Sequence, residues 1–174
     1  YECYAINSLD LKYRKIPSPL RYVVGKIAYQ FPWFHGRKFL VRNGLPLEDY
    51  FTGSAFIFTE KEKKKVLKDK YLVGKTFKEV TKPIFDKVKD KDEVTKMQYL
   101  DMHLWLPEDI LLKADKMTMA NSVEGRVPFL SQEIINYLSG HSLRKIYTNP
   151  PKQQLAKTFS NILPANILNR KKQP

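Results

Sequence analysis

Cysteine and histidine are scarce in this chain of 174 residues. There is one cysteine, Cys3, and there are three histidines. A single cysteine excludes an internal disulfide framework. So few nitrogen and sulfur ligands also argue against a dedicated zinc site. We therefore expect no metal site within the chain itself.

Long apolar runs are absent as well. The longest, AFIF at 55–58, is far shorter than the roughly 20 residues that a bilayer-spanning helix needs. The first residues do not follow the pattern of a signal peptide. Together with the single cysteine, these features lead us to expect no membrane partner and a reducing, cytoplasmic setting.

Positive charge, by contrast, is abundant, with a net charge of +13. Much of the lysine lies between Glu60 and Asp92, where it alternates with acids, as is typical of solvated helix faces. This pattern, without an aromatic-flanked arginine cluster, disfavours a nucleic-acid partner. A nucleotide or pyrophosphate would require charge of the same sign over a smaller area.

Helical signals follow one another along the chain, and no segment alternates as a strand does. Thr59 and Glu62 have the spacing of a capping box, and Ser18 is the expected cap of the first long helix. Pro83 and Pro107 are expected to kink or interrupt their helices. Capping signals and apolar spacing predict helices over 17–31, 45–58, 60–70, 75–90, 92–122, 131–140 and 151–163, with an aromatic turn over 31–39. The predicted fold class is mostly α.

The stretch SVEGRVPFLSQEI, residues 122–134, places Glu124 and Arg126 two residues apart. The residue before Pro128 favours an extended or turning backbone, in which both side chains would point the same way. They could form a structural ion pair, hold a carboxylate for proton handling, or receive a substrate carboxylate. Spacing alone favours a structural turn. Ser131 is the expected cap of the helix that follows.

Three further positions carry charge near this stretch or near the end of the chain. Asp115 is interpreted as a partly buried structural acid that could pair with Lys116. Lys152 stands at the start of a predicted helix, where an anion would be favoured. Arg170 and Lys172 belong to a basic tail, which by itself is ordinarily solvated surface.

Read in order, several segments resemble the C-terminal synthetase domain of glutamine-hydrolysing asparagine synthetases. They are LPEDILLKADKMTMANSVEGRVPFL, the lysine of PPKQQL, and LPANILNRKK. The family pattern is roughly L-P-x-D-L-L-x-K-x-D-R-M-[ST]-M-A-x-S-[LV]-E-[AVG]-R-V-P-F-L-D. This chain departs from it at Lys116, an arginine in the family, and at Ser131, an acid there. The resemblance is specific from Leu106 to Pro174 and looser upstream.

The resemblance also implies what is missing. The family's S-G-G-x-D-S pyrophosphate loop and its glutaminase domain, with a leading cysteine, do not occur in residues 1–174. Cys3 is not that nucleophile. The chain is therefore expected to be the C-terminal helical portion of a larger α/β synthetase domain, of the adenine-nucleotide alpha-hydrolase-like class. By itself it is expected to bind ATP poorly and to make no asparagine.

In such an enzyme, ATP adenylates the side-chain carboxylate of aspartate, and ammonia from glutamine then displaces AMP. The resemblance implies that ATP and Mg²⁺ are bound mainly by the absent upstream half, and a homo-oligomer is possible. It assigns catalysis to Lys172 and Glu124, substrate or phosphate binding to Lys152, Arg126 and Arg170, and structural roles to Asp115 and Pro128. The alternatives are amidation of another carboxylate, or a basic helical module that binds nucleic acid or an acidic partner.

Overall fold

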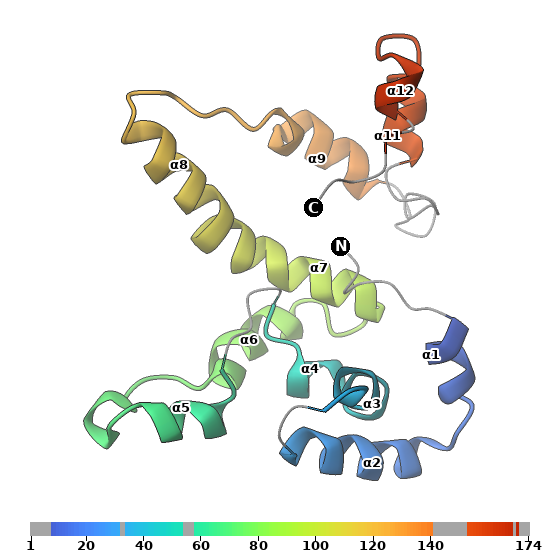
Figure 1. Cartoon of the computed structure of the whole chain (residues 1–174), viewed down its shortest axis with the longest axis vertical. Coiled ribbons are helices and arrows are strands. Elements are labelled where there is room, and N and C mark those ends of the chain that lie inside the picture. Colours follow the sequence, from blue (N-terminus) through green and yellow to red (C-terminus); the bar gives the residue numbers. More distant parts are fainter. Residues whose placement is uncertain (1–7, 32–33, 54–57, 141–152, 169, 171–174) are drawn as a thin grey trace. The chain divides into compact units, whose positions relative to one another are not determined.

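The computed structural model describes residues 8–31, 34–53, 58–140, 153–168 and 170. Within these ranges every regular element is helical, and there is no strand (Figure 1). The chain divides into two compact units, Tyr1–Glu124 and Gly125–Pro174, which are considered separately below. The mostly-α fold class predicted from the sequence is confirmed.

In the first unit, α2 (Ser18–Gln30) and α3 (Arg37–Gly44) make the most extensive helix–helix contact. The two helices cross, with α3 seen nearly end-on in Figure 1. A Cβ atom placed on Gly25 would lie 2.9 Å from the Cα of Gly44. Because neither glycine carries a side chain, the two backbones can touch at the crossing.

The first predicted helix is confirmed, but the prediction of its capping residue is wrong. Ser18 is already helical, and Pro17 is the N-cap, without a side-chain capping bond. The aromatic turn expected over 31–39 ends early, because Arg37 opens α3. Gly36 is the N-cap of α3 and has a φ of 90°, a conformation that glycine adopts without steric cost.

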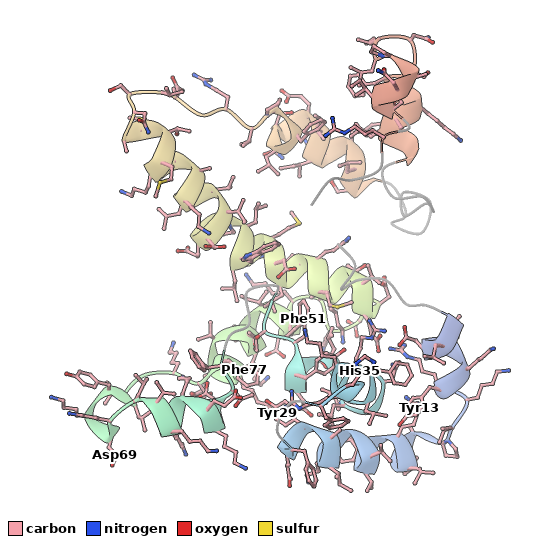
Figure 2. The ribbon with its side chains drawn as sticks, viewed as in Figure 1. Tyr13, Tyr29, His35, Phe51, Asp69 and Phe77 are labelled. Atoms are coloured by element: carbon pink, nitrogen blue, oxygen red, sulfur yellow. The ribbon has the colours of Figure 1, made fainter. Side chains whose placement is uncertain are left out.

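The core of the first unit lies where α4 (Leu47–Tyr50), α6 (Phe77–Asp86) and α7 (Glu93–His103) meet. Phe51, labelled in Figure 2, follows α4 directly and belongs to this core. The buried apolar side chains that form it are Leu47, Phe51, Phe85, Met97 and Leu100. Leu100 is fully buried.

The helix predicted over 45–58 is wrong in extent, since among the described residues 45–53 and 58 only the four of α4 are helical. Phe51 ends the helix with extended backbone angles. Gly53 then adopts a φ of 96°, outside the helical region. Its missing side chain also leaves room for Asp101, whose Oδ1 would lie 3.0 Å from a Cβ at this position.

Two capping boxes begin consecutive helices of the first unit. Thr59 caps α5 (Glu60–Val66) together with Glu62, as predicted, although the helix ends before residue 70 and is followed by the 3-10 turn η2 (Asp69–Tyr71). Thr76 and Glu79 form the same motif at the start of α6. Pro83 does not split α6, which runs without a break to Asp86.

The long tract predicted over 92–122 is interrupted around Pro107. Leu104 leaves the helical region at φ −120° and ψ −69°, and the π-helical turn η3 (Leu106–Leu111) follows before α8 (Leu112–Met119). Pro107 has no N–H, and its ring crowds the carbonyl of His103. The wider π turn relieves that crowding. The predicted interruption is confirmed.

The second unit contains η4 (Pro128–Leu130), α9 (Gln132–Ser139), α11 (Gln153–Thr158) and α12 (Ala165–Leu168). The Ser131 hydroxyl accepts a hydrogen bond from the backbone N–H of Ile134, so the predicted cap of α9 is confirmed. The helix predicted over 151–163 is seen over 153–158, and its first two residues lie outside the described ranges. No side chain described in this unit is buried.

Candidate functional site

A backbone turn of defined geometry ends α8 and begins the segment singled out in the sequence. The N–H of Val123 donates to the carbonyl of Thr118, and the N–H of Ser122 donates to that of Met119, both at 3.0 Å. This pair of bonds is the Schellman motif. Ser122 occupies its left-handed position, with φ 57°, where glycine is usual. The motif fixes the direction in which the chain leaves α8.

Two polar side chains of the preceding MTMANS run bond to backbone carbonyls of α8. The hydroxyl of Thr118 donates to the carbonyl of Ala114 at 2.9 Å, and Nδ2 of Asn121 donates to that of Met117 at 2.9 Å. The carbonyl of Met117 is among the last four of the helix, which lack intrahelical donors, whereas that of Ala114 lies almost one turn earlier. Asn121 therefore supports the helix end from which Glu124 follows.

The backbone from 123 to 127 is non-helical, as expected, and its side chains are exposed. Glu124 is the last residue of the first unit, and Arg126 belongs to the second. Val127 has φ −120° and ψ 80°, outside the helical region that a following proline disfavours. Pro128 is the first residue of η4, a position that suits its fixed φ.

Asp115 does not have the environment expected from the sequence, because it is exposed on α8. It forms no ion pair with Lys116 within the described ranges, since adjacent side chains on a helix point in different directions. Asp109, in η3, is paired instead: its carboxylate lies 3.0 Å from Nζ of Lys113 and accepts from Nε1 of Trp105 at 3.0 Å. The bond from Lys113 lowers the pKa of Asp109.

The remaining predicted site residues lie near the end of the chain. Arg170 is exposed, and its backbone N–H donates to the carbonyl of Ile167 at 3.3 Å, which closes the turn after α12. Lys152 and Lys172 lie outside the described residues. Their roles remain predictions that rest on the sequence.

A buried polar cluster in the first unit was not predicted. Asp10, on α1 (Ser8–Tyr13), is fully buried. Each of its oxygens lies 2.6 Å from Nη2 of Arg42, and Nδ2 of Asn43 donates to it at 2.6 Å. These bonds compensate the carboxylate for the loss of water. Residues more than 30 positions apart form this cluster, and no local pattern in the sequence reveals such a pairing.

Comparison with known proteins identifies the family. The protein-family model described as Asparagine synthase matches residues 23–174. The chain belongs to the asparagine synthase family. It is 41% identical over 167 residues to asparagine synthetase [glutamine-hydrolyzing] 1 of Bacillus subtilis, covering 94% of this chain and 26% of that protein. It is 37% identical over 159 residues to a putative asparagine synthetase [glutamine-hydrolyzing] of Mycobacterium tuberculosis, covering 90% and 24%.

This family assignment confirms the resemblance found in the sequence. The chain spans about a quarter of the length of the curated relatives it matches. No solved structure matches it. In the described ranges, no cluster of three histidine, cysteine or acidic side chains could hold a metal ion, and no helix is long and apolar enough to cross a bilayer.

Proposed function

We propose that the chain is the C-terminal helical part of the synthetase domain of an ATP-dependent asparagine synthetase. The complete enzyme adenylates the side-chain carboxylate of aspartate and releases pyrophosphate. Ammonia derived from glutamine then attacks the acyl carbon, and AMP leaves. The observation that carries this proposal is the 41% identity, over nearly the whole chain, to a protein named asparagine synthetase [glutamine-hydrolyzing] 1.

We propose Lys172 as the main catalytic residue that this chain contributes. An ammonium group held beside the adenylate and pyrophosphate would stabilise the negative charge that develops when the acyl–phosphate bond breaks. Glu124 would orient the groups around the reacting carboxylate. Lys152, Arg126 and Arg170 would bind the substrate carboxylate or the phosphates: the two guanidinium groups match the geometry of these anions, and the lysine adds a point charge.

The conformation of residues 123–127 supports this assignment of Glu124 and Arg126. The Schellman turn after α8 holds one end of this segment, and η4 begins directly after the other end. Both side chains are exposed. Exposed side chains need little rearrangement to reach a substrate, whereas buried ones would first have to leave a packed core.

In the proposed reaction ATP transfers its adenylyl group to the carboxylate and loses pyrophosphate, and we expect the nucleotide to be held mainly by residues outside this chain. The same holds for Mg²⁺, because the described residues contain no ligand set that fits a metal ion. We therefore assign no step of this chain's chemistry to Mg²⁺. What we assign to the chain is binding and charge stabilisation on one side of the reacting carboxylate.

The test is a product analysis of the full-length protein given aspartate, ATP and glutamine. We expect asparagine, AMP and pyrophosphate in equal amounts. Formation of ADP and phosphate in their place would contradict the proposal. A panel of other carboxylates tests the acceptor, and preferential amidation of one of them would replace aspartate as the substrate. The 174-residue chain alone is expected to be inactive.

The role of Lys172 is tested with a matched neighbour. Lys172→Ala should lower kcat by about 100- to 1000-fold, the usual effect of removing one group that stabilises transition-state charge. Lys171→Ala removes the same charge one residue earlier in the basic tail and should leave kcat within about twofold. Equal losses in the two variants would show that the tail acts only through its total charge.

A further inference from the structure

A cavity of about 440 Å³ lies beside the crossing of α2 and α3 in the first unit. Its lining includes Arg14, Arg21, Asn43 and Glu93, together with Ser18 from the first turn of α2. Its volume is within the range of small-molecule sites. None of the described residues that we assign to the synthetase reaction lines it.

Two guanidinium groups converge in this cavity on a single residue. Nε of Arg14 donates to Oδ1 of Asn43 at 3.0 Å, and Nη1 of Arg21 donates to the carbonyl of Asn43 at 2.5 Å. The other bonds of these groups run from Arg14 to Glu93 at 2.7 Å and from Arg21 to the carbonyl of Ile16 at 2.8 Å. Asn43 is itself buried and therefore holds both arginines in place.

Each of these arginines has more donors than its bonds use. A guanidinium group carries five N–H bonds, and within the described ranges Arg14 and Arg21 each use two of them. Three N–H groups thus remain on each side chain. Arg21 has no carboxylate partner in this part of the chain. Spare donors on paired planar guanidinium groups are the usual means of binding a phosphate group.

The surrounding charge has the sign that an anion requires. The hairpin from residue 18 to residue 44 contains no aspartate or glutamate, and its cations are Arg21, Lys26, Arg37, Lys38 and Arg42. Glu93 is the one carboxylate in the described lining. The first turn of α2 adds partial positive charge at the same rim, because its N-cap, Pro17, supplies no side-chain acceptor.

We propose that this cavity binds a phosphate-class oxyanion, either free phosphate or the phosphate group of a nucleotide, between the guanidinium groups of Arg14 and Arg21. This goes beyond the proposed synthetase reaction, since the cavity lies in the first unit and lacks the residues assigned to that reaction. Glu93 competes with the anion for Arg14. Neutralising Glu93 therefore strengthens binding, and neutralising Arg21 weakens it.

The experiment is a calorimetric titration of the full 174-residue chain with inorganic phosphate, and separately with AMP, at constant ionic strength set by chloride. Arg21→Gln should weaken binding about tenfold, the usual effect of losing a charge-assisted hydrogen bond. Arg37→Gln is the matched control. It removes an arginine of the same hairpin that bonds to the carbonyls of Ala28 and Tyr29 and does not line the cavity, so it should change the affinity less than about twofold.

Glu93→Gln keeps the shape of the side chain and should tighten binding by roughly three- to tenfold. This variant keeps the proposal testable if Arg21→Gln fails to fold. Tighter binding of AMP than of phosphate identifies a nucleotide phosphate, and equal binding identifies free phosphate. Any of three results would overturn the proposal: the unchanged chain binds neither phosphate nor AMP, Glu93→Gln leaves the affinity unchanged, or Arg21→Gln and Arg37→Gln lower the affinity equally.

Discussion

Replacing Gly25 by alanine tests the packing of α2 against α3. A Cβ atom at this position would lie 2.9 Å from the Cα of Gly44, 3.1 Å from its carbonyl carbon and 3.2 Å from the carbonyl oxygen of Leu40. All three atoms belong to the backbone. No side chain can therefore rotate away, and the two helices must move apart to accept the methyl group.

The net change in the free energy of unfolding combines one stabilising contribution with two destabilising ones. Alanine in a helix interior is about 1 kcal/mol more favourable than glycine. Overpacking of a closed contact costs about 1–3 kcal/mol. Separation of the helices also stretches the bonds from Arg21 to the carbonyl of Asn43 and from Arg37 to that of Ala28, each worth roughly 1 kcal/mol. We expect Gly25→Ala to lower the free energy of unfolding by about 2 kcal/mol.

The assay is urea unfolding followed by far-ultraviolet circular dichroism. The control is Gly140→Ala, because a Cβ at Gly140 meets its nearest neighbour, the carbonyl oxygen of Tyr137, at an ordinary 3.6 Å. Its φ of −77° also suits any residue, so this variant should stay within about 0.5 kcal/mol of the unchanged chain. If Gly25→Ala is as stable as the control, the close crossing of α2 and α3 is wrong.

Three further predictions concern a helix end, two caps and a buried phenol. Ser122→Gly should raise the melting temperature by a few degrees, because it relieves a left-handed conformation that costs an L-residue roughly 1 kcal/mol; a lower melting temperature would contradict the Schellman turn. Thr76→Ala should lower the global unfolding free energy by about 1 kcal/mol, whereas Thr59→Ala should only speed amide exchange locally in α5, which has no buried residue; equal global losses would contradict this. Burial raises the pKa of Tyr50 above its ordinary 10.0, so its neutral form stabilises the fold below pH 10, and that stability is lost as the pH rises further. Tyr50→Phe should reduce the alkaline loss seen in pH-dependent melting, and an unchanged loss would refute the assignment.

Two helix caps could be predicted from the sequence, because they depend on residues a few positions apart. The box of Thr59 with Glu62 and the cap at Ser131 were predicted because a capping bond joins residues three positions apart. The same rule would have found Thr76 and Glu79. The helix predicted over 45–58 was wrong in extent because apolar residues such as Phe51 pack into the core from outside the short helix α4.

The long-range features could not be predicted from one sequence. The burial of Asp10 depends on Arg42 and Asn43, which a separate helix brings to it. The exposure of Asp115 depends on which face of α8 remains uncovered, and spacing along a helix does not determine that. The family, by contrast, was evident from the motif at 106–130, because its unusual residue order is itself the signal.

We propose that this chain is part of an enzyme that activates the aspartate carboxylate with ATP. Isotope exchange between pyrophosphate and ATP, measured on the full-length protein without glutamine or ammonia, tests it most directly, because exchange requires only the adenylation step and its reversal. We predict exchange that depends on aspartate and falls sharply in Lys172→Ala. Two results would contradict this. One is exchange that proceeds equally without aspartate. The other is no exchange from a protein that still makes asparagine and releases ADP.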